Sequence, residues 1–460
     1  GTKGGYVALE SINPATGELF ETYDEWSSAR IQKTLTMVNL AWRDWQQTSF
    51  EERSDKMRNV AQLLRRNQDE YARIMALEMG KPLTSGRAEI EKCAWVCEYY
   101  AENAASMLAA ESAPSDGSYA YVAFRPLGTI LAVMPWNFPF WQVFRFAAPA
   151  LMAGNTGVLK HSSNVPRCAR AIEDIFRQAG FPENVFCALM ISAKQVDEVI
   201  ESDVIKAITL TGSDAAGRKV AAKAGDMLKK VVLELGGSDP FIVLADADVV
   251  ESAETAARSR CINSGQSCIA AKRFIITTDI YEMWLEKFQQ AMAAQVVSDP
   301  LDEQTQIGPQ AREDLMRQLH RQVETSVGKG AKLLLGGQPL KGQGYYYPPT
   351  ILTGVKPGMP AFHEELFGPV AAVIQVRDTE EAIEVANASS FGLGCSVWTR
   401  NSKKGEALAA RIEVGAVFIN DLVKSDPRLP FGGVKNSGFG RELSHYGIKQ
   451  FVNIQTIWVK

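Results

Sequence analysis

Short apolar runs rich in branched residues alternate with helical segments along most of this 460-residue chain. The clearest apolar runs are Thr129–Met134, Thr156–Lys160, Ile205–Leu210, Val231–Leu233 and Phe241–Leu244. Helical segments lie between some of them, at Pro166–Ala179 and Ala215–Ala224. Runs that are apolar throughout are typical of strands buried on both faces, and their alternation with helices predicts parallel sheets with helical crossovers. The pattern resumes from Arg273 to Ile419, and the chain is longer than the ~250–300 residues that one core usually serves. We therefore predict an α/β protein with two or more domains.

The two ends of the chain follow other patterns. Residues 27–110 are predicted to be helical, with one continuous helix over Glu51–Met79 that ends before Gly80. Asp246 is the predicted N-cap of a later helix. The apolar run Phe451–Val459 is predicted to be a lone strand, whose free edge would invite pairing with another subunit.

Composition narrows the classes of function. The 49 Lys and Arg and the 53 Asp and Glu give a net charge of −4 without a basic stripe, which argues against a nucleic-acid partner. The most apolar stretch, Gly128–Gly154, contains three prolines and Arg145, so we interpret it as buried core and predict no membrane span. Seven irregularly spaced cysteines, four histidines and no CxxC motif predict neither a disulfide framework nor a metal site, and indicate the reducing cytoplasm.

One cysteine lies in an unusual setting. Cys268 ends a polar turn that begins at Asn263 and contains Gly265, between a predicted helix and a predicted strand. Backbone N–H groups in such a turn can stabilise a thiolate, which attacks carbonyl carbons well and later leaves well. The alternative is that Cys268 only packs in the core, as most free cysteines do.

Two further polar residues follow predicted strands. Glu234 lies in the segment Leu233–Gly237, where burial could raise the pKa of its carboxyl and make it a general base. Its alternative role is an ion pair with a nearby lysine. Asn137 lies between Pro135 and Pro139 and offers an amide N–H to an oxyanion, unless it is only a turn residue.

Taken in order along the chain, these segments resemble the NAD(P)-dependent aldehyde dehydrogenase superfamily. The matching motifs are PWNFP at 135–139, AGNTGVLK at 153–160, LTGS at 210–213, LELGG at 233–237, NSGQSC at 263–268, EELFGPV at 364–370 and PFGGVKNSGFGRE at 430–442. The resemblance implies the aldehyde dehydrogenase fold: a variant Rossmann cofactor domain (1–117 and 142–234), an α/β catalytic domain (235–445) and a small β oligomerisation arm (118–141 and 446–460). The usual GxGxxG fingerprint is absent, so motif rules alone do not predict the Rossmann domain.

The resemblance also implies a role for each matching residue. Cys268 is expected to be the nucleophile and Glu234 the general base, and Asn137 with the backbone N–H of Cys268 is expected to form the oxyanion hole. The residues expected to bind the cofactor are Pro135, Trp136, Lys160, Ser162, Ser163, Thr211, Gly212, Ser213, Gly236, Glu365 and Phe367. The implied reaction oxidises an aldehyde to an acid through a thioester on Cys268.

Within the superfamily the chain most resembles succinate semialdehyde dehydrogenases. Arg145, in an otherwise apolar segment, and Ser425, just before the PFGG motif, match residues that bind the substrate carboxylate, which a guanidinium can hold by both oxygens. The alternative is that Arg145 pairs with a protein glutamate. Other semialdehydes and sugar-derived aldehydes remain open as substrates. CoA-acylating oxidation and a non-catalytic binding function are less favoured, because both Cys268 and Glu234 are present.

Ser163 bears on the choice between NAD and NADP. Many NAD-linked relatives carry a glutamate there, and a carboxylate would repel the 2′-phosphate of NADP by ~1–4 kcal/mol at a few ångströms. We therefore predict that both cofactors are used, with Lys160 pairing with the phosphate and His161 contributing weakly. The loss of a repulsion does not by itself add an attraction, so the sequence does not predict the ratio of NADP use to NAD use. We also expect a homodimer or homotetramer that associates through the last strand.

Overall fold

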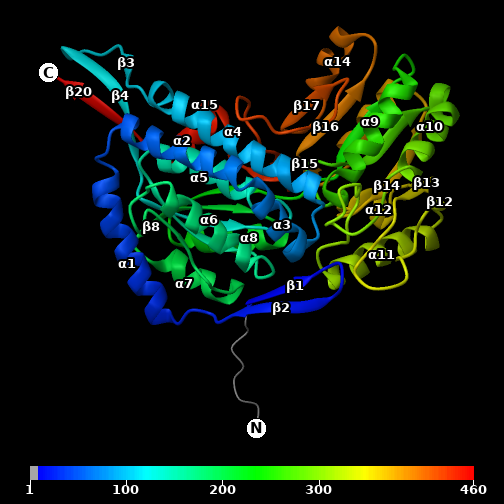
Figure 1. Cartoon of the computed structure of the whole chain (residues 1–460). Coiled ribbons are helices and arrows are strands. Elements are labelled where there is room, and N and C mark those ends of the chain that lie inside the picture. Colours follow the sequence, from blue (N-terminus) through cyan, green and yellow to red (C-terminus); the bar gives the residue numbers. More distant parts are fainter. Residues whose placement is uncertain (1–8) are drawn as a thin grey trace.

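Two mainly parallel sheets, one after the other along the chain, organise the structure, a computed structural model that describes residues 9–460 (Figure 1). The first sheet has, in spatial order, β19 (Gly438–Phe439), β9 (Lys230–Glu234), β8 (Ile205–Thr211), β5 (Thr129–Met134), β6 (Thr156–His161) and β7 (Phe186–Ala188). All neighbours in it are parallel except β19 and β9. The chain enters at β5, adds β6 and β7 on one side, and then adds β8 and β9 on the other. Such a reversal opens a crevice at the carboxyl ends of the central strands.

Helices cover both faces of this sheet because successive residues of each strand point to opposite sides. Ile130 and Ala132 of β5 pack in the same core as one group of helices, and Leu131 packs with another. The first group is α2 (Phe50–Arg66), α3 (Gln68–Met79), α4 (Leu83–Met107), α5 (Trp141–Met152) and α6 (Pro166–Gln178). The second is α1 (Ser28–Trp45), α7 (Val196–Glu201) and α8 (Asp214–Asp226).

The second sheet has seven strands. Their spatial order is β12 (Lys332–Leu335), β13 (Thr350–Thr353), β14 (Val370–Val376), β11 (Ala271–Thr277), β10 (Asp239–Val243), β16 (Gly394–Trp398) and β17 (Ala416–Ile419), and only β12 is antiparallel to its neighbour. One face packs against α9 (Val249–Cys261) and α10 (Tyr281–Ala293). The other packs against α11 (Glu313–Gly328), α12 (Pro360–His363), α13 (Thr379–Asn387) and α14 (Ser402–Ala409).

The two sheets meet end to end. β9 ends at Glu234 and β10 begins at Asp239, and so few residues span little more than ~14 Å. The carboxyl edge of the six-stranded sheet therefore lies against the amino edge of the seven-stranded sheet. Asn137 and Glu234 come from the first edge, and Cys268 and Glu365 precede strands at the second. The fold thus brings residues from distant segments to one junction.

A third, three-stranded sheet projects at the left of Figure 1 and holds the last strand. β20 (Val452–Val459) pairs along its whole length with β4 (Tyr119–Pro126), which also pairs with β3 (Glu111–Ala113). The sequence had predicted that this last strand stands alone, but β20 is paired with β4 in the structure. The predicted arm segment 118–141 is divided in the structure: β4 lies in the projecting sheet, whereas β5 lies inside the six-stranded sheet because it is buried between β6 and β8. Residues 1–8 of the predicted range 1–117 lie outside the described residues.

Two predicted helix boundaries are wrong. The segment Glu51–Met79 forms two helices, α2 and α3, because Asn67 leaves helical geometry at φ −106° and ψ 24°. The N-cap of α9 is Asp248, whose side chain accepts a hydrogen bond from the N–H of Glu251. The predicted cap, Asp246, instead accepts a hydrogen bond from the Thr399 hydroxyl.

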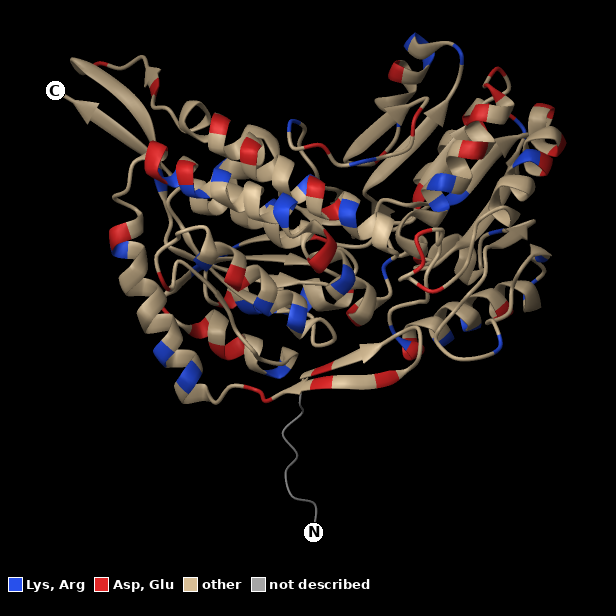
Figure 2. Ribbon diagram, in the orientation of Figure 1, with Lys and Arg blue, Asp and Glu red and all other residues tan. Residues whose placement is uncertain are grey.

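The remaining elements are short. They are β1 (Leu9–Asn13), β2 (Glu18–Tyr23), β15 (Phe391–Gly392), β18 (Val434–Lys435), α15 (Ser444–Ile448) and the 3-10 turns Ala193–Gln195, Ile262–Gly265, Thr278–Ile280 and Lys449–Phe451. Figure 2 shows that basic and acidic residues are interspersed along the ribbon, with no face of one sign in this view. Across residues 9–460, no helix combines the length and the apolarity that crossing a bilayer requires.

Candidate active site

A cavity of about 490 Å³ lies at the junction of the two sheets, and Cys268, Arg145 and Ser425 all line it. Cys268 is half-buried, whereas the other six cysteines of the chain are buried. Cys268 packs against the main core and also reaches the cavity. The structure brings the predicted nucleophile and both predicted carboxylate-binding residues to one cavity.

A constrained turn holds Cys268 in place. Asn263, Ser264 and Gly265 have left-handed backbones, with φ values of 53°, 57° and 80°, which is rare for residues other than glycine. A Cβ on Gly265 would lie 2.0 Å from the carbonyl carbon of Gly368. The turn is therefore fitted closely against the loop before β14, and only glycine suits its third position.

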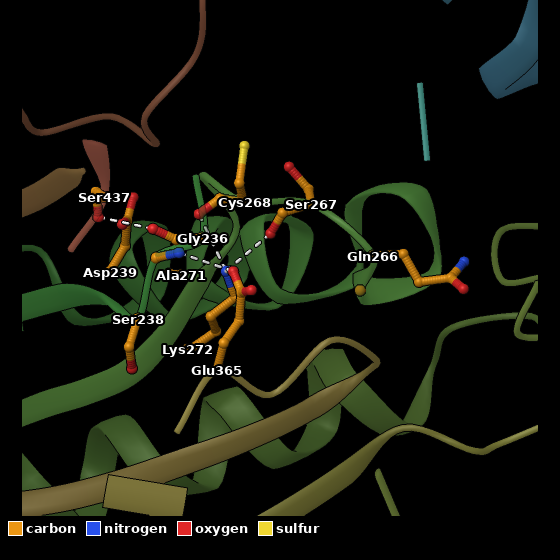
Figure 3. Close-up of polar contacts among 12 residues, drawn as sticks. Gly236, Ser238, Asp239, Gln266, Ser267, Cys268, Ala271, Lys272, Glu365 and Ser437 are labelled. Atoms are coloured by element: carbon orange, nitrogen blue, oxygen red, sulfur yellow. Dashed lines mark hydrogen bonds and ion pairs between the residues drawn. The ribbon is translucent and has the colours of Figure 1, made fainter. Parts of the chain in front are cut away.

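Lys272 supports this turn from below. Its ammonium donates to the carbonyl oxygens of Ser267 at 2.9 Å and Cys268 at 3.0 Å, and it forms an ion pair with Glu365 at 3.0 Å. Figure 3 shows these contacts on one side of the turn, while Sγ of Cys268 points away from them. Burial raises the pKa of the Cys268 thiol to about 12, although Lys272 and Arg145 oppose that rise. The resting nucleophile is therefore a thiol, and attack on a carbonyl requires that its proton leave.

Asn137 is oriented by hydrogen bonds on both ends of its amide. Gln142 donates to Oδ1 at 3.2 Å, and Nδ2 donates to the carbonyl of Gln266 at 3.2 Å. One N–H of Nδ2 is left for another acceptor, because an amide nitrogen carries two. Within residues 9–460 the backbone N–H of Cys268 also donates to no other group. Both donors are thus free of other acceptors, which an oxyanion hole would require of them.

A buried ion pair supports the turn that carries Asn137. Lys81 pairs with Glu89 and donates to the backbone carbonyl of Asn137 at 3.0 Å. The other oxygen of Glu89 accepts from the N–H groups of Phe140 at 2.9 Å and Trp141 at 3.0 Å, where α5 begins. A carboxylate is favoured at a helix N-terminus, so the pair fixes the start of α5. The sequence indicated neither residue, because Lys81, between α3 and α4, and Glu89, on α4, both lie far from the motif along the chain.

Glu234 is fully buried at the end of β9, and neither of its carboxyl oxygens has a hydrogen-bond partner among the described residues. Burial raises the pKa of Glu234 well above its usual value, and the negative charge of Glu442 adds to the rise, against Arg145 and Arg441. The expected alternative, an ion pair with a lysine, is not found within residues 9–460. A carboxyl that keeps its proton to high pH and lacks partners has the properties of a group that exchanges protons.

The residues expected on the cofactor side follow β5, β6 and β8 at the crevice. Lys160 is buried in β6 and forms no ion pair within residues 9–460, and burial lowers its pKa to about 8. Ser213 caps α8, so the free N–H groups of that helix face the same edge, as an anionic ligand requires. Ser163 is exposed, and the Ser162 hydroxyl donates to Asn164 at 2.6 Å. A buried cation without an ion-pair partner and a helix N-terminus at the same sheet edge both suit the anionic phosphates of a dinucleotide.

His161 does not fit its predicted supporting role. Its Nε2 lies 2.8 Å from the carbonyl oxygen of Pro139, and the ring is buried. Burial lowers the pKa of His161 to about 4, so the ring is uncharged at neutral pH and cannot attract a phosphate. Thr211 is also engaged, because its hydroxyl accepts a hydrogen bond from Arg145 at 3.1 Å.

Glu365 and Phe367 lie beside the nucleophile turn. The N–H of Gly237 donates to Glu365 at 2.8 Å. A Cβ on Gly236 would lie 2.6 Å from Oε1 of Glu365, which explains a glycine at that position. The ring of Phe367 meets that of Trp136 edge-on, with centroids 5.7 Å apart. The three motifs that contain these residues are thus in direct contact.

Arg145 is fully buried in α5, and the structure gives it the partner that the sequence had left as an alternative. Its guanidinium forms an ion pair with Glu442 at 3.0 Å and lies 4.7 Å from the centre of the Phe431 ring. Its Nε has no hydrogen-bond partner among the described residues. Arg145 therefore lines the cavity with its charge largely balanced by the protein. No group of three or more His, Cys, Asp or Glu residues within 9–460 could hold a metal ion.

Comparison with known proteins identifies the family of the chain. The model of the aldehyde dehydrogenase family matches residues 3–457. A probable NADP(+) succinate-semialdehyde dehydrogenase of Synechocystis sp. is 49% identical over 98% of this chain and 100% of its own length. The NAD(P)+ succinate semialdehyde dehydrogenase Sad of Escherichia coli is 48% identical over 97% of each chain.

A solved structure has nearly the same fold. The succinic semialdehyde dehydrogenase of Streptococcus pyogenes, determined in complex with NADP+, has a TM-score of 0.96 and 38% identity, over 98% of this chain and 100% of its own. The predicted fold class is thus confirmed. With one family spanning nearly all its residues, this chain belongs to the aldehyde dehydrogenase family.

Proposed function

We propose that this enzyme oxidises succinate semialdehyde to succinate with NADP or NAD, through a thioester on Cys268. The observation that carries the proposal is the shared cavity, where a half-buried nucleophile lies in the same space as cationic and hydroxyl groups suited to a carboxylate. The relatives that cover almost the whole chain are named for the same reaction.

The protein's part in the first step follows from its donors. Sγ of Cys268 loses its proton to water in the cavity and bonds to the aldehyde carbon. The carbon–oxygen double bond opens, and the oxygen gains negative charge that the Asn137 amide and the Cys268 backbone N–H would stabilise. Donors fixed before the reaction cost no reorganisation during it, and one such donor is worth ~10²–10³ in rate. The bound nicotinamide supplies the oxidising power by accepting a hydride.

Glu234 serves the second step. The thioester carbon must accept a water molecule, and a carboxylate that removes the water's proton makes that water a nucleophile. Glu234 has two free oxygens for this role. When the carbon–sulfur bond breaks, the acid departs and Sγ of Cys268 regains a proton. A water-derived oxygen thus ends in the acid, so no CoA is required.

The cofactor would be held by groups at the crevice. We assign the adenine-side phosphate and ribose to Lys160, Ser162 and Ser163, and the pyrophosphate to the α8 N-terminus with Thr211, Gly212 and Ser213. Pro135, Trp136, Gly236, Glu365 and Phe367 are assigned to the nicotinamide end. The buried Lys160 without a partner supports the first assignment, because a buried cation is costly unless a ligand compensates it.

Arg145 and Ser425 are proposed to bind the substrate carboxylate. Nε of Arg145 is buried without a partner, and Ser425 lines the same cavity. The enzyme is further proposed to act in the cytoplasm as a homodimer or homotetramer.

The test is a product-resolved assay. Purified enzyme is given succinate semialdehyde or butanal, with NADP or NAD, with and without CoA, and the products are identified by mass spectrometry. We expect succinate without CoA and a kcat/KM for succinate semialdehyde at least about tenfold above that for butanal, as one charged contact would provide. Equal kcat/KM values would reject the substrate, and succinyl-CoA as the product would reject hydrolysis.

A further inference from the structure

Lys92 is a further cation of the cavity, and the sequence motifs do not indicate it. It lies on α4, half-buried, and it lines the cavity together with Cys268 and Arg145. Its ammonium donates a hydrogen bond to the hydroxyl of Ser425, and it lies 4.5 Å from the centre of the Trp141 ring. The hydroxyl expected to bind the substrate carboxylate is therefore already held by a lysine.

The carboxylates around Lys92 are engaged elsewhere. Glu89, one turn away on α4, pairs with Lys81; Glu442 pairs with Arg145; and Asp426, in the loop that carries Ser425, pairs with Arg428. Within residues 9–460, no carboxylate lies within 4.0 Å of the Lys92 ammonium. Among the described residues, Lys92 and Arg258 both line the cavity without a carboxylate partner, whereas the charge of Arg145 is balanced by Glu442. Of the two, Lys92 is the one that holds the Ser425 hydroxyl, since Arg258 donates to Thr255.

We infer that Lys92 and Ser425 together form the main contact for the carboxylate of the aldehyde substrate, with Arg145 as a supporting donor. A carboxylate accepting from both Lys92 and Ser425 would supply the negative charge that this part of the cavity lacks, and a charged hydrogen bond is stronger than a neutral one. The inference deepens the proposed function and depends on it, because it concerns only substrates with a carboxylate.

The titration of Lys92 provides an independent readout. Burial, and then the charge of Arg145, lower the pKa of Lys92 to about 8, while Cys93, Asp426 and Glu89 act in the opposite direction. The lysine therefore loses its charge as the pH rises through this range. A bound carboxylate would favour the charged form, so substrate affinity should fall as the pH rises past about 8.

The experiment compares Lys92→Met and Lys92→Arg with the wild type, on succinate semialdehyde and on butanal. We expect Lys92→Met to raise KM for succinate semialdehyde at least about tenfold and to change KM for butanal less than about twofold. Lys92→Arg should keep most of the discrimination. In the wild type, KM for succinate semialdehyde divided by KM for butanal should increase above pH 8. In Lys92→Arg this ratio should stay constant, because a guanidinium remains charged.

Lys56→Met is the matched control, since it removes a half-buried lysine outside the cavity that is already paired with Glu52 at 3.4 Å. Its KM values should stay within about twofold of the wild type, as for other surface ion pairs. Circular dichroism and thermal unfolding check that each variant folds, and Lys92→Gln replaces Lys92→Met if the latter does not. Two outcomes would show that Lys92 does not bind the carboxylate, provided that the wild type prefers succinate semialdehyde. In one, Lys92→Met keeps that preference; in the other, Lys92→Met loses activity on both substrates equally. If the wild type itself shows no preference, the proposed function has failed instead.

Discussion

At the scale of single residues, the catalytic centre combines a thiol and a carboxyl that both resist ionisation. Burial raises the pKa values of Cys268 and Glu234 together. Neither group is charged in advance, so each proton must move during a chemical step. The buried Glu442 adds negative charge next to Glu234, while Arg145 pairs with Glu442. If Glu234 is the base, as proposed, the balance among these three side chains sets the pH at which it can activate water.

Glu234→Gln should separate the two half-reactions. The amide cannot take a proton from water, so the thioester should form and then persist, giving one equivalent of NAD(P)H per active site followed by turnover at least about 100-fold slower. Rapid-mixing absorbance measures the burst, and intact-protein mass spectrometry detects the acyl group on Cys268. Cys268→Ser should show neither signal. Steady turnover of Glu234→Gln at the wild-type rate would exclude Glu234 as the base.

The pH dependence of hydrolysis follows from the direction of the shift. The pKa of Glu234 is raised, so its proton-accepting form accumulates only at higher pH than for an ordinary glutamate. We expect kcat, measured where hydrolysis limits turnover, to increase from neutral towards alkaline pH. The same profile for the residual activity of Glu234→Gln should be flat over that range. A wild-type kcat already constant from pH ~5, near an ordinary glutamate pKa, would contradict the shift.

Ser163→Glu tests the choice of cofactor. Ser163 is exposed beside the buried Lys160, and a carboxylate there would repel a 2′-phosphate. At ~1–4 kcal/mol, the repulsion should lower kcat/KM for NADP by about tenfold or more and change that for NAD little. Ser163→Gln is the neutral control of matched size. If Ser163→Glu keeps full activity with NADP, charge at this position does not select the cofactor; if the wild type rejects NADP, the assignment of Ser163 is wrong.

At the scale of elements, the turn between α9 and β11 is the least tolerant part of the site. Its three consecutive left-handed residues are held by Arg260, which donates to the Gly265 carbonyl at 2.7 Å, and by Lys272 below the nucleophile. The geometry of Cys268 therefore depends on backbone fit as much as on side chains.

Gly265→Ala should disrupt that fit. The added Cβ would lie 2.0 Å from the Gly368 backbone, at a φ of 80° that alanine disfavours. We expect the free energy of unfolding to fall by about 1–3 kcal/mol or more and activity to be lost. Gly225→Ala is the matched control, because nothing lies within 4 Å of its Cβ position near the end of α8. Thermal unfolding and turnover measure both variants, and an active, stable Gly265→Ala would refute the constraint.

At the scale of the whole molecule, the projecting sheet carries large apolar side chains that are exposed. Ile454 is 65% exposed and Trp458 49% exposed on β20, and Tyr119 is 58% exposed on the adjoining β4. An edge strand with such residues is prone to pair with another chain. This pattern supports assembly through the last strand.

Deletion of residues 453–460 should therefore reduce the oligomer to a monomer or cause aggregation, as measured by light scattering. The deletion spares Phe451 and Val452, which pack in the main core, so the subunit itself should still fold. Leu228→Glu provides a control on another surface, since Leu228 is 95% exposed in a turn after α8. An unchanged oligomer after the deletion would mean that the subunits meet elsewhere.

Local chemistry by itself determined much of this protein. All five apolar runs named from the sequence became strands, because the preference of a branched apolar run for a buried strand depends on neighbouring residues alone. The ordered motifs likewise identified the family and named Cys268, Asn137 and Glu234 before any contact was known. The break at Asn67 and the cap at Asp248 were missed, because several polar residues near each boundary can end or start a helix and packing selects among them.

Only the tertiary structure decided which charges meet. Lys92 and Ser425 lie 333 positions apart, so no pattern in either segment predicts their hydrogen bond. The partner of Arg145 was left open by the sequence, and the fold chose Glu442. β5 entered the six-stranded sheet, although motif boundaries had grouped it with β4. The type of a side chain limits what it can bind. Whether its charge is balanced inside a cavity depends on every neighbour that the fold brings there. For this reason the role that we infer for Lys92 rests on the tertiary structure alone.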